Sequence, residues 1–214
     1  LAKWKLLLRL IRMLLPQEKV TARFPSSLKG GGHPPPFAGE AQMFSDEILS
    51  TALIYISRGW AVFPLHTIID GQCSCGIVNC EDAGKHPRTQ RGVKDASKDE
   101  AQIRTWFGKE APASNIAIAT GSISDLTVFD IDIRQGKNGA ASWNEAVKDH
   151  GEPETLLVET GSGGMHVYFR YNSALKTCSD FFGKKSHVDV RNDGGYVASP
   201  PSRHSSGGSY KWLN

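Results

Sequence analysis

The chain has 214 residues, 39% of them hydrophobic and 22% charged, which is typical of one soluble globular domain with a sizeable core. The net charge of +3 is uneven, because residues 1–24 carry +5 and the remainder carries −2. A global basic field is therefore no evidence for nucleic-acid binding, which would have to use local patches.

The first fifteen residues have two interpretations. They could form a basic amphipathic helix that contacts a membrane, DNA or a partner, or a weakly packed tail, which we favour. Their apolar run is interrupted by Arg9 and Arg12. It is also shorter than the roughly 20 residues that span a bilayer, so we predict neither a membrane span nor a signal peptide.

Residues 24–41 are rich in glycine and proline, with a Gly-Gly-Gly and a Pro-Pro-Pro run, and such a segment cannot build a packed element. We therefore assign residues 1–44 to a basic tail and a Gly/Pro-rich linker, and residues 45–214 to a folded domain. The domain is expected to open with a helix, with Ser45 as its N-cap and Gly59 at its end. A strand is expected at 60–65.

A cysteine-rich loop follows, which we place at residues 71–88. Four zinc-type ligands lie there within fourteen positions, namely Cys73, Cys75, Cys80 and His86. Crowded cysteines beside a histidine favour a metal over disulfides in a reducing compartment, so we expect structural Zn²⁺ and a cytoplasmic protein. Free thiols remain the alternative, because the Cys-x-Cys spacing is tighter than the common Cys-x₂-Cys. A catalytic zinc is disfavoured, since protein ligands fill all four positions.

Basic residues cluster at the end of this loop, namely Lys85, Arg88, Arg91 and Lys94. Such a run is usually a solvated face, but here it could contact template phosphates. A helix is then predicted from a capping box at Ser97 through Trp106.

The rest of the domain alternates short strands with one helix. Strands are predicted at 115–120, 126–133, 155–160, 165–171, 187–191 and 196–198, and the helix at 141–148. Successive hairpin-like strands with few helices predict an α+β fold with a largely antiparallel sheet.

Two acidic residues end the strand at 126–133. Side chains alternate faces along a strand, so Asp130 and Asp132 share one face while Phe129, Ile131 and Ile133 point into the core. Strands often end in acids that merely meet solvent, and the pair alone is a weak signal. Two neighbouring carboxylates nevertheless repel each other unless a cation lies between them.

A third acid, Asp189, lies on a later strand and shares its face with His187 and Arg191. Together the three carboxylates offer the oxygen ligands that Mg²⁺ or Mn²⁺ prefers. Two ions bridged by them would activate a 3′-hydroxyl and stabilise a pyrophosphate leaving group.

The glycine-rich segment Gly161–Gly164 joins two predicted strands. It could be an ordinary hairpin loop, or the N–H groups of Gly163 and Gly164 could approach phosphate oxygens closely. Ser162 offers a hydroxyl, and His166 can donate to a phosphate. A lone strand histidine is usually structural, but the glycine loop and the acids nearby favour a phosphate contact.

The order of these motifs resembles the bifunctional primase–polymerase (prim-pol) domain of the archaeo-eukaryotic primase superfamily, over about residues 46–214. The segments that carry the resemblance are Gly59–Pro64, Gly84–Pro87, Asn115–Ile118, Thr120–Gly121, Phe129–Asp132, Gly161–His166, Val188–Arg191 and Gly194–Ser202.

The resemblance implies an RNA-recognition-motif-like catalytic sheet flanked by helices, with the cysteine loop as a zinc-binding insertion. It implies template-directed nucleotidyl transfer in the replication of a plasmid, phage or mobile element, with Asp130, Asp132 and Asp189 as the acidic triad. Ser162 and His166 would contact the phosphates of the incoming nucleotide, and Arg191 would lie near it. The implied partners are single-stranded DNA, nucleoside triphosphates and a fused or separate helicase, and no membrane.

Two other functions stay open. A non-catalytic nucleic-acid-binding module could use the same sheet, although a mere binder needs no carboxylates facing a polyanion. A metal-dependent phosphohydrolase would need only the metals and the phosphate loop, and would not require a template strand.

Overall fold

The computed structural model describes residues 38–214 except 112, 135 and 150, so the predicted basic tail and most of the linker lie outside the described residues. The helices are α2 (Ala38–Ser57), the 3₁₀ turn η1 (Gly92–Asp95), α3 (Glu100–Thr105), the π-helical turn η2 (Trp106–Glu110) and α4 (Gly139–Val147). The strands are β1 (Val62–Leu65), β2 (Ile68–Ile69), β3 (Gln72–Cys73), β4 (Asn115–Ala119), β5 (Leu126–Ile131), β6 (Leu157–Glu159), β7 (Met165–Arg170), β8 (Val188–Arg191), β9 (Tyr196–Ser199) and β10 (Lys211–Trp212).

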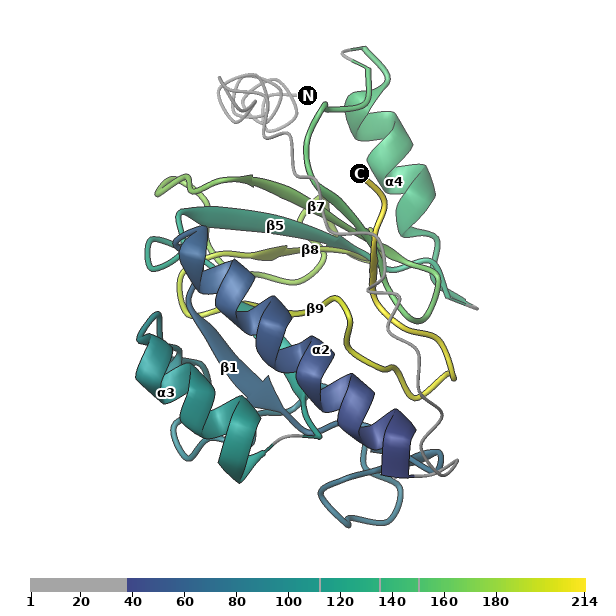
Figure 1. Cartoon of the computed structure of the whole chain (residues 1–214). Coiled ribbons are helices and arrows are strands. Elements are labelled where there is room, and N and C mark those ends of the chain that lie inside the picture. The colour runs from purple at the N-terminus through teal and green to yellow at the C-terminus, as the bar shows by residue number, and fades with distance from the viewer. Residues whose placement is uncertain (1–37, 112, 135, 150) are drawn as a thin grey trace.

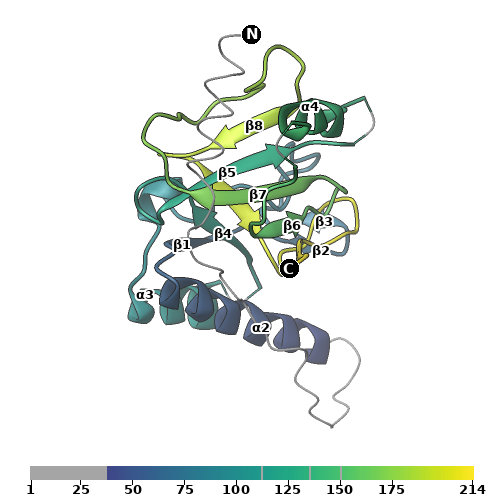
Figure 2. The ribbon, with the colours of Figure 1, turned by 90° about the horizontal axis from the view of Figure 1, so that it is seen from above.

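Two antiparallel sheets form the body of the described chain. The smaller has the order β1-β4-β9 and the larger the order β10-β6-β7-β5-β8, while β2 and β3 form a separate hairpin. Helices α2 and α3 lie against the smaller sheet (Figure 1). Figure 2 shows α4 on the opposite side of the molecule, beside β8 and β5. The predicted α+β class and the antiparallel pairing are confirmed.

The larger sheet is apolar on both faces, and this divides the core in two. Phe129, Ile131 and Val188 face α4 and pack around its fully buried Trp143. Val128 and Tyr168 alternate with them and join the second cluster, which fills the space between the two sheets and α2. Polar side chains on the face that carries Val128 and Tyr168 must therefore point into the space between the two sheets.

Two of the three predicted helix starts are wrong. Helix α2 already includes Ala38, and Ser45 lies buried in its interior and is not its N-cap. Helix α3 is capped by Asp99, whose extended backbone lets Oδ1 accept hydrogen bonds from the N–H groups of Ala101 (2.8 Å) and Gln102 (3.3 Å). Ser97 instead accepts a bond from the N–H of Asp99.

Strand β5 is shorter than predicted, and Ile133 is not in the core. The strand ends where Ile131 pairs with the first residue of β7, Met165. Beyond this point the chain leaves the sheet, so Ile133 is 41% exposed. No helix in the described part of the chain has both the length and the apolar character to cross a membrane.

Candidate functional site

Three of the predicted site residues form one row across the larger sheet. In the register of β7, β5 and β8, Asp130 lies directly opposite His166 on one side and Asp189 on the other. Directly opposed residues project to the same face with Cβ atoms about 5 Å apart. Their side chains therefore gather on the face that looks toward the smaller sheet.

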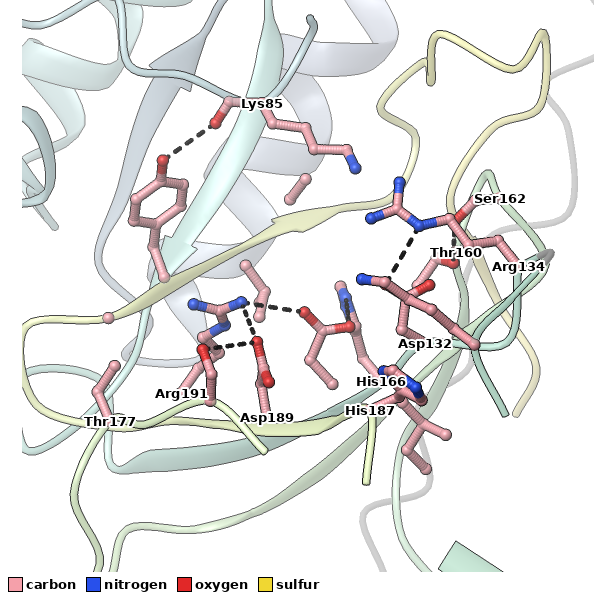
Figure 3. Close-up of a pocket in the computed structure, with 18 of the residues that line it drawn as sticks. Lys85, Asp132, Arg134, Thr160, Ser162, His166, Thr177, His187, Asp189 and Arg191 are labelled. Carbon is pink, nitrogen blue, oxygen red and sulfur yellow. Dashed lines mark hydrogen bonds and ion pairs between the residues drawn. The ribbon is translucent and has the colours of Figure 1, made fainter. Parts of the chain in front are cut away.

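The row is connected by hydrogen bonds and ion pairs (Figure 3). Arg191, two residues after Asp189 and so on the same face, places Nη2 2.9 Å from Oδ2 of Asp189 and 3.4 Å from Oδ2 of Asp130. His166 Nε2 lies 3.5 Å from Oδ1 of Asp130. Burial favours the neutral acid, but His166 and Arg191 lower the pKa of Asp130 to about 2. Asp130 is therefore ionised at neutral pH.

Asp132 lies one residue beyond β5 and joins the same site from its end. Its carboxylate pairs with Lys137 Nζ at 2.6 Å and Arg134 Nε at 3.3 Å. Its backbone is fixed on both sides, because its N–H donates to the carbonyl of His187 and its carbonyl accepts from Gly139 N–H, both at 2.9 Å. The predicted pairing of Asp130 and Asp132 in one site thus depends on this anchored backbone, not on a continuing strand.

The carboxylates, Ser162, His166 and Arg191 all line one cleft of about 650 Å³. Its wall also includes groups from the smaller sheet and from the cysteine loop, among them Lys85 and Tyr196. A volume of this size is in the range of small-molecule sites, and the mixture of acids and bases suits a ligand that carries phosphates. The structure therefore brings together most of the site residues that the sequence predicted.

The glycine loop contributes to this cleft differently from the prediction. Thr160 and Ser162 line it, whereas Gly163 and Gly164 line a neighbouring cavity of about 300 Å³. Both glycine N–H groups donate within the loop, to the carbonyl and the hydroxyl of Thr160 at 2.9 Å each. A Cβ on Gly164 would lie 2.5 Å from the carbonyl oxygen of Ile131. The geometry favours a shape-determining role for these two glycines over amide contacts with a ligand.

His166 is almost wholly buried, and this fixes its orientation. Its Nδ1 is buried and has no hydrogen-bond partner among the described residues. The ring lies between Tyr168 and Tyr210, with centroid distances of 6.3 Å and 5.8 Å. The imidazole thus points Nε2 at Asp130 and is both a site residue and a packing residue.

A second cluster is formed by the four residues predicted as zinc ligands. The ligand atoms of Cys73, Cys75, Cys80 and His86 all lie within 4.8 Å of one another, and Cys73 Sγ is 3.4 Å from His86 Nε2. At a Zn–S distance of about 2.3 Å, one ion fits among atoms this close, and a Cys₃His set is a zinc donor set. The predicted candidate metal-binding cluster is present, and its residues fit the ion.

The thiols of this cluster perturb one another. Burial raises the pKa of Cys73, but hydrogen bonds from the N–H groups of Cys75 and Gly84 outweigh it, with His86 assisting, and the pKa falls to about 7. Burial and the sulfurs of Cys75 and Cys73 raise the pKa of Cys80 to about 11. A divalent cation would relieve this crowding by binding all three as thiolates.

The basic run beyond the loop is divided between two environments. Arg88 donates to the carbonyl of Ala113 at 3.1 Å, and Arg91 pairs with Asp95 at 2.7 Å, so both make contacts within the domain. Lys85 alone of the four lines the cleft. The run of charges in the sequence did not distinguish it from its neighbours. Tyr196 and Tyr210 were also missed as cleft residues, because the sequence marks Tyr196 only as a strand aromatic and predicts no element at Tyr210.

Comparison with known protein families gives a match. A family model described as bifunctional DNA primase/polymerase, N-terminal, matches residues 52–214, which include every candidate site residue named above. No curated protein matches the sequence.

Proposed function

Because the chain belongs to the bifunctional DNA primase/polymerase family, we propose that it joins nucleoside triphosphates on a single-stranded DNA template by a two-metal mechanism. One observation carries the proposal beyond the family: Asp130 and Asp189 lie opposite each other with one cationic nitrogen, Arg191 Nη2, within 3.4 Å of both. Two carboxylates that converge on one cation are what a divalent metal site requires.

Asp130, Asp132 and Asp189 would hold Mg²⁺ or Mn²⁺. When bound, these ions would lower the pKa of the attacking 3′-hydroxyl and offset charge on the leaving pyrophosphate. His166 and Arg191 keep Asp130 ionised, and so maintain it as a ligand at neutral pH, while Arg191 also contacts Asp189. Lys137 and Arg134 hold the Asp132 carboxylate at the end of the row.

Ser162, His166 and Arg191 would bind the phosphates of the incoming nucleotide. Ser162 lines the cleft on the glycine loop, and its hydroxyl lies 3.2 Å from that of Thr160, which fixes the loop's shape. Charge-assisted bonds from Arg191 are the strong kind that phosphate oxygens accept, and an imidazole N–H of His166 would be a further donor. Gly163 and Gly164 would serve these contacts through the shape of the loop.

The remaining assignments extend this proposal. The larger sheet would be the family's RNA-recognition-motif-like catalytic sheet, in a domain spanning 45–214 together with the first turns of α2. The Cys/His cluster would hold structural Zn²⁺. We expect the protein to act in the cytoplasm, in replication of a plasmid, phage or mobile element, with a fused or separate helicase as partner.

A template assay tests the proposal. The chain is incubated with labelled nucleotides, Mg²⁺ or Mn²⁺, and single-stranded DNA with and without an annealed primer. Template-dependent incorporation is expected. Release of phosphate or pyrophosphate without a template would indicate the phosphohydrolase, and DNA binding without incorporation would indicate the non-catalytic module.

A further inference from the structure

Lys85 differs from the other lysine and arginine side chains of the cleft wall. Arg191 pairs with Asp189 and Asp130, and Lys137 and Arg134 pair with Asp132. Lys85 forms no ion pair with any residue that the structure describes. This half-buried side chain beside a site for a polyanion thus makes no close ion pair with the described residues, and the carboxylates of Asp130, Asp132 and Asp82 attract its charge only from a longer distance.

The side chain also enters from a different direction. The acids, Arg191 and His166 project from the larger sheet, whereas Lys85 comes from the cysteine loop on the other side of the cleft. Figure 3 shows it extending across the cleft toward Arg134. A ligand lying on the larger sheet would therefore have Lys85 over its exposed side.

The backbone around Lys85 is fixed at three consecutive carbonyls. Gly84 O accepts a bond from the buried side chain of Asn115 at 2.8 Å, Lys85 O accepts from the Tyr196 hydroxyl at 3.1 Å, and His86 O accepts from the N–H of His66 at 2.9 Å. Gly84 itself has φ +76°, and a Cβ there would lie 3.1 Å from Ile68. This segment is built to hold one conformation.

The next residue, His86, belongs to the Cys/His cluster. An ion bound there would tie this histidine to Cys73 on β3 and to the two cysteines of the loop. The position of the Lys85 ammonium group would then depend on the cluster, although Lys85 is no metal ligand. The cluster would thus influence the cleft through Lys85, which a metal site that only stabilises a surface loop would not do.

We propose that Lys85 is a nucleotide-contact residue that binds the triphosphate from the wall opposite the acidic row, and that the Cys/His cluster positions it. The inference rests on the proposed function, since it assumes a triphosphate in the cleft. An ammonium group in this place contributes a charge-assisted bond, and its loss should weaken triphosphate binding about ten- to hundredfold.

The test is the affinity of the whole chain for dATP and for dAMP with Mg²⁺, in the absence of DNA. Lys85→Met keeps most of the side-chain volume and removes the charge. We expect dATP to bind about ten- to hundredfold more weakly and dAMP to bind within about twofold of the wild type. Lys85→Arg should restore part of the loss. Lys109→Met, at an exposed lysine on η2, is the matched control and should change neither affinity.

A second arm tests the positioning. Tyr196→Phe removes the hydroxyl that bonds to Lys85 O, and should weaken dATP binding in the wild type but not in the Lys85→Met background. Removal of zinc should likewise weaken dATP binding in the wild type but not in the Lys85→Met variant, and restoring zinc should reverse the loss. Melting temperature is measured in parallel. If zinc removal unfolds the chain, the Tyr196→Phe cycle alone decides.

The outcomes separate the two proposals. A wild-type chain that binds dATP while Lys85→Met binds it equally well refutes the role of Lys85 and leaves the proposed function standing. Equal weakening of dATP and dAMP, or weakened binding of single-stranded DNA with dATP unaffected, also overturns the inference. A wild-type chain that binds no triphosphate and incorporates none overturns the proposed function itself.

Discussion

Replacement of Asp130 by asparagine should abolish nucleotide incorporation while the domain still folds. The substitution keeps the shape of the side chain but removes the charge at the centre of the row, where His166 and Arg191 lie 3.5 Å and 3.4 Å from its oxygens. Loss of a carboxylate that positions divalent ions should cost several kcal/mol of transition-state stabilisation, or about a thousandfold in rate.

The cost in stability should be far smaller. The folded-state pKa of Asp130 is about 2 and the side chain is 29% exposed, so against an unfolded value of 3.8 the charge contributes about 2 kcal/mol to the free energy of unfolding at neutral pH. For a chain of this length, that corresponds to a drop in melting temperature of about 4–8 °C. Because the pKa is lowered on folding, this contribution exists above pH 4 and disappears as the pH falls toward 2.

The assay is primer extension by the wild type, Asp130→Asn and a control, together with thermal melts between pH 3 and pH 7. Asp125→Asn is the matched control, since Asp125 lies on the turn before the same strand, outside the cleft, and asparagine tolerates its φ of 54°. The control should extend primers normally. Extension by Asp130→Asn within a few-fold of the control would refute the metal-ligand role. A difference in melting temperature that does not shrink at low pH would refute the electrostatic account.

Three further predictions follow from the site. Protein purified without added metal should contain one Zn²⁺ per chain at Cys73, Cys75, Cys80 and His86, and a content near zero by elemental analysis, with three reactive thiols, would contradict this. His166→Ala should lower kcat/KM for nucleotides at least about tenfold with template affinity unchanged, and should also lower the melting temperature, because the ring is buried; normal kinetics in the folded variant would exclude the nucleotide contact. Gly139→Ala should cost about 1–3 kcal/mol of stability and lower activity, because its Cβ would lie 2.5 Å from the carbonyl oxygen of His187 and 2.8 Å from that of Asp132. The control is Gly108→Ala, whose Cβ would have its nearest neighbour at 3.7 Å and which should be neutral in the same melts.

The sequence predicted the acidic face because alternation along a strand is a local property. Alternate residues of a strand share a face whatever the strand pairs with, so the face of Asp130 follows from β5 alone. Asp132 lies beyond the strand, and it reaches the same site through its hydrogen-bonded backbone instead. The register is different, because it depends on residues far apart in the chain. That Asp130 faces both His166 and Asp189 follows only from the pairing of three strands.

The errors have two different causes. A helix start at Ser45 was predicted from a capping residue, but the preceding Ala-Gly-Glu-Ala-Gln-Met contains no proline to stop the helix, and α2 begins at Ala38. The role of Lys85 was hidden for another reason. Its neighbours in the sequence are equally basic, and only the folding of the cysteine loop beside β9 and β4 separates it from them.

The order of the strands along the chain has a consequence for how the cleft can move. The backbone passes from the smaller sheet to the larger after β4, returns with β9, and passes again to the larger with β10. No cut between Val62 and Trp212 would release two fragments that each own a complete sheet. The two walls of the cleft are therefore joined by the backbone at three places. A hinge motion that opened the cleft would have to displace all three connections. We therefore expect substrates to be accommodated by side chains and loops at the rim of the cleft, while the distance between the two sheets stays as it is in the folded domain.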